Sequence, residues 1–150
     1  MVDSRAKGAR VETQVRDKLR TLTKLKWERT PLSGAMSPSL KMKGDLFIPG
    51  ENNRYCVEVK GYKDDHLTSK YLTSVNPMIS TWWAQALREA KQTDKLPLLI
   101  FKFDRSKLFV AFDLAEVPVF SGNFMYLSRD KIYVMELEDW IKQEEPSFII

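Results

Sequence analysis

The sequence predicts an α/β fold in which helices flank a central mixed β-sheet. Apolar residues recur with helical spacing over residues 8–24 and again over residues 77–93. Runs rich in β-branched and aromatic residues lie between these segments and after the second one, as expected of strands. The order of one helix, three strands, one helix and two strands is typical of an α/β domain. A length of 150 residues suits a single domain, 1–150.

The first helix is expected over residues 8–24. Its apolar residues, beginning with Val11 and Val15, recur at spacings of four, four and three and form one stripe. A short strand is expected to follow over residues 26–30, where the next proline ends it.

A loop and a hairpin come next. Residues 31–43 hold two prolines, one glycine and three serines, a composition that indicates a loop. Residues 44–49 and 54–61 are expected to be strands joined by a four-residue turn. Residues 62–75 are polar and are expected to be irregular.

Asn76 is expected to cap the second helix, which would begin at Pro77 and extend to about Thr93. Four further elements are expected downstream: strands over residues 96–103 and 107–112, a hairpin around residues 130–131, and a short acidic helix over residues 137–142.

The net charge of +4 is unevenly distributed along the chain. Residues 1–43 hold 11 Lys and Arg against 4 Asp and Glu, whereas residues 44–150 hold 13 against 16. The basic N-terminal third is a candidate footprint for a polyanion such as DNA. Lys41 and Lys43 flank the loop and are expected to meet phosphate. The alternative for the N-terminal third is a solvated helix face with surplus lysines, and the alternative for Lys41 and Lys43 is simple solubility.

The single cysteine, Cys56, excludes an internal disulfide and any zinc site built from several cysteines. It lies in an apolar run, so we expect a small buried side chain rather than a nucleophile. No apolar run approaches the roughly 18 residues of a membrane span, and the N-terminus lacks the apolar stretch of a signal peptide. A cytoplasmic protein is the simplest expectation.

A candidate site lies in the predicted hairpin. If residues 50–53 form the turn, opposed residues have numbers that sum to 103, so Asp45 faces Glu58. Directly opposed side chains project from one face with Cβ atoms about 5 Å apart. Strand periodicity places Lys60 on that face as well. The opposite face receives apolar residues, namely Leu46, Ile48, Val57 and Val59.

Two opposed carboxylates destabilise a sheet unless a cation lies between them. Asp45 and Glu58 are therefore candidate ligands of Mg²⁺, which prefers oxygen ligands, and the main-chain carbonyl of Val59 is a third. The metal would lower the pKa of a bound water, and Lys60 would orient that water or neutralise charge on a phosphate. This pattern favours phosphodiester hydrolysis. The alternatives are a turn or edge residue at Asp45 and a surface pair of Glu58 with Lys60.

Glu12 lies beside Val11, at the edge of the apolar stripe of the first helix. If that stripe packs on the sheet, the Glu12 carboxylate can face the metal end of the hairpin. An exposed helix glutamate is the alternative.

The pattern G-D-L at residues 44–46, followed by V-E-V-K-G at residues 57–61, resembles the PD-(D/E)xK nuclease superfamily. The fold that this resemblance implies is a restriction-endonuclease-like core. Gly44 is a departure, because the superfamily's nominal motif has proline at this position.

Within the superfamily, the chain is most similar to archaeal-type, Hjc-like Holliday junction resolvases, including viral relatives. This similarity depends on K-G-x-x-x-E (residues 7–12), which opens the first helix, and on R-T-P-L-S-G (residues 29–34). It covers roughly residues 5–113. Residues 114–150 are then a C-terminal extension whose role the resemblance leaves open.

The resemblance implies that a homodimer cuts four-way DNA junctions, in recombination or repair, with Mg²⁺ or with Mn²⁺ in its place. It implies that Glu12, Asp45 and Glu58 serve the metal site and that Lys60 serves catalysis. It further implies a serine near the scissile phosphate, basic residues that grip DNA, and a glutamine that approaches the site. These are Ser33 in the first role, Arg5, Lys7 and Arg10 in the second, and Gln85 in the third.

Two symmetric cuts need two symmetric sites, which a two-fold dimer supplies. Its interface is expected among apolar residues beyond the needs of one core, with core packing as the alternative. These candidates are Trp82, Trp83, Phe109 and Phe112. Two other functions stay open: a nuclease of the same fold that acts on duplex or branched DNA, restriction-like or a repair nickase, and a catalytically inert DNA-binding module.

Overall fold

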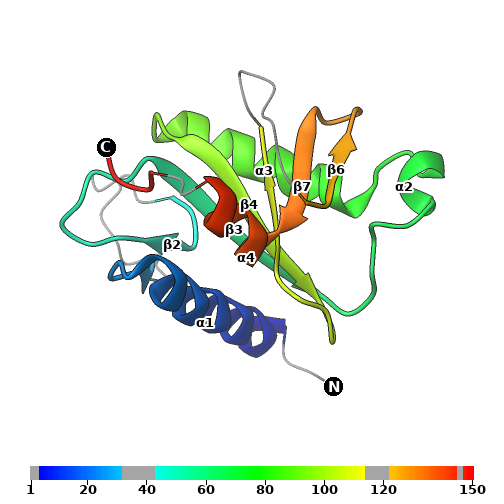
Figure 1. The fold of residues 1–150 in the computed structure, drawn as a ribbon. Coiled ribbons are helices and arrows are strands. Elements are labelled where there is room, and N and C mark those ends of the chain that lie inside the picture. Colours follow the sequence, from blue (N-terminus) through cyan, green and yellow to red (C-terminus); the bar gives the residue numbers. More distant parts are fainter. Residues whose placement is uncertain (1–3, 32–42, 114–121, 145–146) are drawn as a thin grey trace.

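A computed structural model describes residues 4–31, 43–113, 122–144 and 147–150 of the chain. Within these ranges no helix combines the length and hydrophobicity that a membrane crossing requires. The elements in Figure 1 are α1 Ser4–Thr23, β1 Glu28–Arg29, β2 Leu46–Phe47, β3 Tyr55–Tyr62, α2 Lys70–Thr73, α3 Met78–Gln92, β4 Leu96–Phe103, β5 Phe109–Phe112, β6 Phe124–Leu127, β7 Ile132–Glu136 and α4 Leu137–Glu144.

Over the described residues, the sheet has seven strands in the order β1-β2-β3-β4-β5-β7-β6. β3 and β4 are parallel from Tyr55 opposite Leu96 to Tyr62 opposite Phe103, and the other neighbouring strands are antiparallel. A parallel pair needs a crossover connection, which α2 and α3 provide. The predicted mixed sheet flanked by helices is confirmed.

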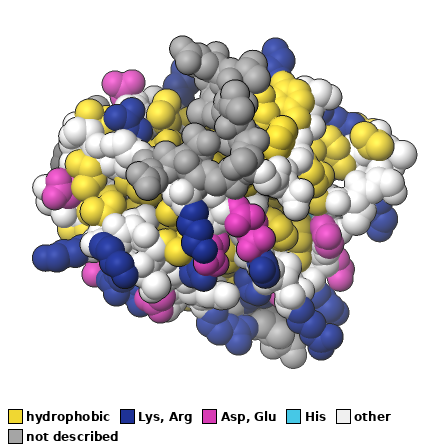
Figure 2. Space-filling model, in the orientation of Figure 1, with side chains coloured by type: hydrophobic (Ala, Val, Ile, Leu, Met, Phe, Trp, Pro, Cys, Tyr) yellow, Lys and Arg dark blue, Asp and Glu magenta, His cyan; other side chains and the backbone are white. Residues whose placement is uncertain are grey.

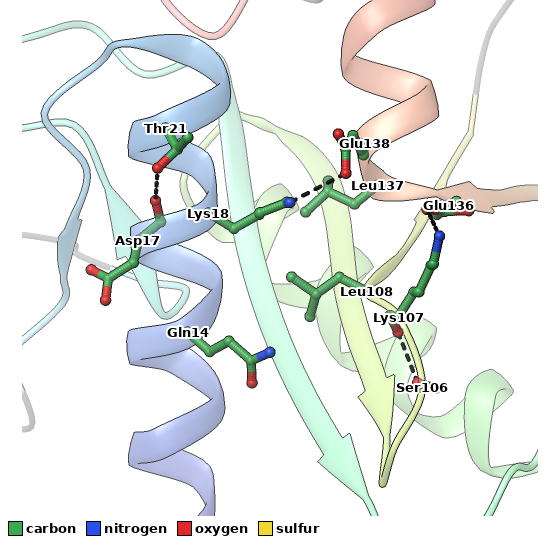
Figure 3. Close-up of a pocket in the computed structure, with 10 residues that line it drawn as sticks. All are labelled: Gln14, Asp17, Lys18, Thr21, Ser106, Lys107, Leu108, Glu136, Leu137 and Glu138. Atoms are coloured by element: carbon green, nitrogen blue, oxygen red, sulfur yellow. Dashed lines mark hydrogen bonds and ion pairs between the residues drawn. The ribbon is translucent and has the colours of Figure 1, made fainter.

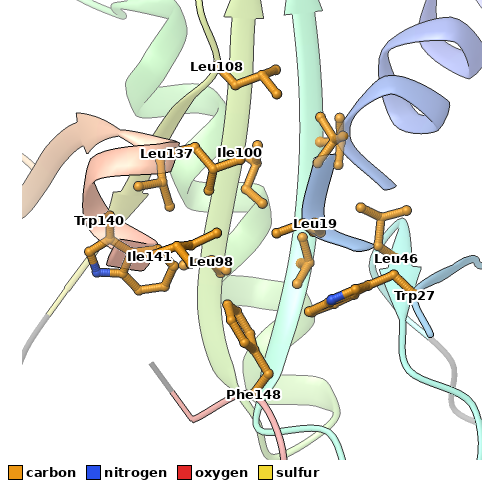
Figure 4. Packing of buried hydrophobic residues seen from close by; sticks show 14 of the residues in the cluster. Leu19, Trp27, Leu46, Leu98, Ile100, Leu108, Leu137, Trp140, Ile141 and Phe148 are labelled. Carbon is orange, nitrogen blue, oxygen red and sulfur yellow. The ribbon is translucent and has the colours of Figure 1, made fainter. Parts of the chain in front are cut away.

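The β4 strand is buried on both faces, so alternate residues belong to different cores. Leu98 and Ile100 pack in the core with α1 and α4, whereas Leu99 and Phe101 pack in the core with α3. Figure 4 shows the first of these cores, in which the rings of Trp27 and Phe148 meet edge to face at 5.1 Å. Helices therefore cover both faces of the sheet, as Figure 1 shows.

Three of the four aromatic residues considered for a dimer interface belong to these cores. Trp82 and Trp83 on α3 and Phe112 on β5 are buried, with exposed fractions of 7%, 2% and 2%. Phe109 is partly buried against the α3 core. The expectation of an interface at these residues is wrong for the three buried ones, because packing within one chain already covers them.

The first helix differs from its prediction at both ends. It begins earlier, at Ser4, and ends at Thr23, because Lys24 adopts a positive φ of 62°. The second helix begins at Met78, since Pro77 is its N-cap and the expected cap at Asn76 is not formed.

The remaining boundaries shift by a few residues. The strand expected over 26–30 forms only at β1, and the polar segment 62–75 contains the short helix α2. The strand over 96–103 is confirmed over its full length, whereas the one over 107–112 narrows to β5. The expected C-terminal hairpin is confirmed as β6 and β7, and the acidic helix extends to Glu144.

The described part of the C-terminal extension completes the sheet and braces the first hairpin. β7 pairs with β5, and α4 lies on the same side of the sheet as α1. The amide of Arg54 donates to the Phe148 carbonyl, and the amide of Ile150 donates to the Asn52 carbonyl, both at 2.9 Å. The end of the chain therefore holds the turn that joins β2 to β3.

Candidate active site

The hairpin holds Asp45 beside the strand that carries Glu58, close enough for the Asp45 carboxylate to raise the pKa of Glu58. Leu46 pairs with Val57, which is the register expected for a turn at residues 50–53. Asp45 directly precedes β2, and its amide donates to the Val57 carbonyl at 2.7 Å. Its Oδ2 accepts a hydrogen bond from the amide of Val59 at 2.8 Å. Asp45 is thus fixed against the middle of β3.

The strand predicted over residues 44–49 forms ladder pairs only at Leu46 and Phe47. Beyond them, the side chain of Asn53 replaces a backbone partner. The Ile48 amide donates to Asn53 Oδ1 at 2.7 Å, and Asn53 Nδ2 donates to the Ile48 carbonyl at 2.9 Å. This pair of hydrogen bonds closes the turn and keeps the register.

Gly44 has a structural reason for standing where the superfamily pattern has proline. Its φ is +85°, whereas the proline ring fixes φ near −65°. A Cβ at this position would lie 2.9 Å from the Val57 carbonyl oxygen and 3.1 Å from Cys56 Sγ. The chain passes so closely over β3 that only glycine delivers Asp45 to its place.

Glu58 is the buried partner of the pair, with 2% of its surface exposed. Burial raises the pKa of Glu58 to about 10, with further increases from Glu89 and Asp45. Burial also raises the pKa of Asp45 to about 6, although the Val59 amide opposes this shift. Lys60 lies on the same strand, with its Nζ 4.0 Å from Glu58 Oε2. Burial thus disfavours the ionised form of both carboxyl groups, and a cation beside them would favour it.

These residues fit a hard divalent cation. In an extended strand the N–H and C=O of one residue point to the same edge. Because the Val59 amide meets Asp45, the Val59 carbonyl faces the same edge as this carboxylate. No group of three or more His, Cys, Asp or Glu within the described ranges is placed to hold a metal ion together. Two carboxylates suffice for Mg²⁺, because water and substrate phosphate commonly complete its coordination.

Glu12 approaches the pair from α1 but is engaged elsewhere. Arg29 binds its Oε2 through Nε at 3.0 Å and through a terminal nitrogen at 2.9 Å. α1 lies directly on β3, since a Cβ at Gly61 would lie 2.6 Å from Val11 Cγ2. This close packing brings Glu12 near enough to raise the pKa of Asp45. The structure thus places Glu12 beside the site, with an arginine that the sequence reasoning missed.

Comparisons with known proteins identify the family of the chain. Residues 3–149 match the family described as "Phage putative PDDEXK endonuclease". The chain belongs to this family. Protein D14 of Escherichia phage T5 is 41% identical over 148 residues, which cover 93% of this chain and 92% of that protein.

A solved structure with similarity to the chain is that of Hjc, a Holliday junction resolvase from Archaeoglobus fulgidus. The match has a TM-score of 0.45 at 14% identity and covers 91% of this chain and 93% of that one. The predicted resemblance to PD-(D/E)xK nucleases with viral relatives is confirmed by the family match. The nuclease class of this PDDEXK endonuclease is therefore established, and its DNA substrate is a separate question.

The residues predicted to bind DNA are only partly described. Arg10 and Lys43 are exposed, and Gln85 is half-buried on α3. Lys7 forms an ion pair with Asp104 at 3.1 Å. The predictions for Ser33, Lys41 and the side chain of Arg5 concern parts of the endonuclease that the structure does not describe.

Several cations of the basic N-terminal third form ion pairs. Figure 2 shows Lys and Arg side chains interspersed with Asp and Glu on the face that carries α1. Besides Lys7 and Arg29, three more cations of this region are paired with carboxylates. These pairs are Arg16 with Asp17, Lys18 with Glu138, and Arg20 with Glu28. Glu12, Asp17 and Glu28 already belong to the charge count of residues 1–43, so only the pairs with Asp104 and Glu138 lower the surplus of basic residues in this region of the PDDEXK endonuclease.

The pocket in Figure 3 is separate from the carboxylate pair. It has a volume of about 460 Å³ and lies between α1 and the junction of β7 with α4. Two ion pairs, Lys18 with Glu138 at 3.2 Å and Lys107 with Glu136 at 3.3 Å, lie at its wall. Neither Asp45 nor Glu58 lines it.

Cys56 and Glu89 complete the surroundings of the site. Cys56 is 2% exposed, and burial raises the pKa of its thiol to about 12, which confirms a buried side chain rather than a nucleophile. Glu89 on α3 lies within hydrogen-bonding reach of Glu58 and was missed by the sequence reasoning. Its position four residues after Gln85, on the same side of a helix, is the signal that could have indicated it.

Proposed function

We propose that this chain is a metal-dependent endonuclease that cuts four-way DNA junctions. The main support for metal-dependent hydrolysis is the proximity of Asp45 to buried Glu58, each with a raised pKa, beside the ammonium group of Lys60. Buried carboxylates with raised pKa values need a cation or a proton, and a divalent cation is the choice that also serves phosphodiester hydrolysis. Membership in a PDDEXK endonuclease family supports this choice.

Each residue then has a defined part in hydrolysis. Asp45, Glu58 and the Val59 carbonyl would hold Mg²⁺ or Mn²⁺, which would supply a bound water of lowered pKa and positive charge for phosphate oxygens. Hydrolysis forms one bond from a water oxygen to phosphorus and breaks one phosphorus–oxygen ester bond, and one proton of the water passes to the leaving oxygen. Lys60, whose side chain is 28% exposed, orients the water or neutralises charge on the phosphate. The ion pair of Arg29 with Glu12 holds a further carboxylate at the edge of the site.

The support for a junction substrate comes mainly from the sequence. K-G-x-x-x-E at residues 7–12 and R-T-P-L-S-G at residues 29–34 are the motifs that resemble resolvases. The structure adds one support, because Glu12 and Arg29, which belong to these two motifs, contact each other beside the carboxylate pair. Exposed Arg10 and Lys43 are available to meet phosphates. A homodimer would supply the two symmetric cuts that resolution requires.

The test compares a labelled four-way junction, a flap and a linear duplex of the same sequence, each with Mg²⁺ and with EDTA. The proposal expects paired, symmetric cuts in the junction, little cutting of the duplex, and none in EDTA. Equal cutting of the duplex or flap would instead favour a restriction-like or repair nuclease. Junction binding without any cutting in Mg²⁺ or Mn²⁺ would indicate an inert DNA-binding module, and cutting in excess EDTA would refute the metal mechanism.

A further inference from the structure

One carboxylate oxygen on α3 has no partner that accounts for its burial. Oε2 of Glu89 is shut off from solvent and accepts no hydrogen bond from any described residue. Burial of a carboxylate oxygen without a donor is unfavourable, and native structures rarely contain one. Glu89 therefore needs a donor beyond those that the described residues supply.

The surroundings of Glu89 point to the kind of donor. Its carboxylate lies within hydrogen-bonding reach of Glu58 and close enough to Asp45 to act on it electrostatically. Ionised carboxylates are acceptors only, so they cannot satisfy each other. A proton, a cation or the water of a cation must therefore lie between them.

The charges around the site favour a cation. Glu12 is already neutralised by the arginine of β1. Asp45, Glu58 and Glu89 remain, and Lys60 is the cation that an ion pair places beside them in the described part of the chain. With all three ionised, three carboxylates against one ammonium leave two negative charges, which is the charge that one divalent cation balances.

Glu89 is not placed as a direct ligand. Within the described ranges, no three residues of the His, Cys, Asp and Glu types are positioned to hold one metal ion. Mg²⁺ and Mn²⁺ in such sites keep several water molecules, and these waters are strong hydrogen-bond donors. The unpartnered Oε2 of Glu89 is an acceptor of the matching kind.

We propose that Glu89 is a positioning residue that accepts a hydrogen bond from a water on the divalent cation held by Asp45 and Glu58. This inference rests on the proposed function. It predicts that Glu89 strengthens cation binding through charge and water orientation, without contact to the metal itself.

The experiment measures Mn²⁺ binding to the full chain without DNA, by isothermal titration calorimetry. The variants are Glu89→Gln, Glu89→Asp, Asp45→Asn and, as a matched control, Glu51→Gln, which makes the same chemical change in the exposed hairpin turn. We expect Glu89→Gln to weaken Mn²⁺ binding by about 10–100-fold, the usual cost of losing an outer-shell partner. Asp45→Asn should abolish binding, and Glu51→Gln should leave it unchanged.

The outcomes separate this inference from the proposed function. Should Glu89→Gln bind Mn²⁺ as tightly as the wild type while Asp45→Asn does not bind, Glu89 and Glu58 merely share a proton. The inference then fails and the proposed function stands. A wild-type chain that binds no Mn²⁺ overturns both. Should Glu89→Gln fail to fold, as judged by circular dichroism, Glu89→Asp decides the question, because its shortened side chain must bind more weakly and unchanged affinity refutes the inference.

Discussion

The amide of Val59 donates a 2.8 Å hydrogen bond to Oδ2 of Asp45, so a residue that precedes one strand is anchored at the middle of the next. An ionised carboxylate can accept about four hydrogen bonds or ligand bonds, so Asp45 keeps acceptor capacity for a cation beside this hydrogen bond. The anchoring needs only an oxygen acceptor, whereas the proposed metal binding also needs the negative charge, so a substitution can separate the two.

Asp45→Asn should abolish cutting and preserve the fold. The amide oxygen of Asn can still accept the hydrogen bond from Val59, whereas the lost charge removes a metal ligand. We expect the cleavage rate to fall by more than about 100-fold, beyond the usual effect of losing an outer-shell partner. The measurement is single-turnover cleavage of a labelled junction with Mg²⁺, beside a binding assay in EDTA. Wild-type rates in this variant would place the active site elsewhere.

Glu58→Gln should stabilise the metal-free protein at alkaline pH. Burial raises the folded-state pKa of Glu58 to about 10 from a usual 4.5, so folding disfavours its ionised form. Glu58 therefore favours the folded wild-type protein most below pH 4.5, where the carboxyl group is protonated in both the folded and the unfolded chain. This stability is lost progressively as the pH rises toward 10. In EDTA at pH 8, we expect the variant to exceed the wild type by about 1–3 kcal/mol in free energy of unfolding, an ordinary range for one buried group.

Urea unfolding at pH 5 and pH 8, in EDTA and then with Mn²⁺, checks this prediction. The advantage of the variant should shrink at pH 5, where Glu58 in the unfolded chain is closer to its protonated state. Mn²⁺ should stabilise the wild type much more than the variant, because only binding to the folded state adds stability. A difference in stability that does not depend on pH would contradict the assigned cause.

Gly61→Ala should displace α1 and destabilise the protein, and a smaller side chain at position 11 should restore part of the lost stability. The added Cβ would meet Val11 Cγ2 at 2.6 Å, so we expect a loss of about 1–3 kcal/mol, typical of overpacking. Val11→Ala removes the methyl group in the way, and the double variant should lose less than the sum of the two single losses. Urea unfolding of the four proteins gives the coupling energy. Strictly additive losses would show that the two residues do not meet.

The hairpin could be predicted from sequence because its geometry is local. A four-residue turn determines which residues face each other, and Leu46 opposite Val57 confirms that reasoning. The end of β2 was harder to predict, because the side chain of Asn53 replaces the ladder hydrogen bonds beyond Phe47. Strand propensity does not show where a side chain will take over from the backbone.

The parts of the site that prediction missed come from distant segments. Arg29 reaches Glu12 across 17 positions of sequence. Glu89 comes to Glu58 only because the crossover packs α3 against β3. Spacing rules apply within one element or across a short turn, so they cannot indicate which side chains will meet when two elements are far apart in the sequence. The same limit explains why the aromatic residues of α3 were assigned to an interface. Their spacing does not show that the sheet is buried on both faces, so that these side chains pack in a second core of the same chain.

Gly44→Ala should damage the site more than the same change at a comparable glycine. Gly50 also has a positive φ, +76° against +85° at Gly44, but a Cβ there would meet nothing within 4 Å. Gly50→Ala therefore measures backbone strain alone, which costs about 1–2 kcal/mol for a non-glycine residue in the left-handed region. Gly44→Ala adds contacts of 2.9 Å with the Val57 carbonyl and 3.1 Å with Cys56 Sγ, which push Asp45 away from Val59.

We therefore expect Gly44→Ala to lose more stability than Gly50→Ala and, in addition, to lose junction cleavage, which Gly50→Ala should retain. Gly44→Pro, which restores the superfamily's nominal residue, should be worse still, since its ring excludes a positive φ altogether. Unfolding in urea and single-turnover cleavage of the three variants test both effects. Equal losses at the two glycines would mean that the close passage over β3 does not position Asp45, and that the hairpin register alone is sufficient.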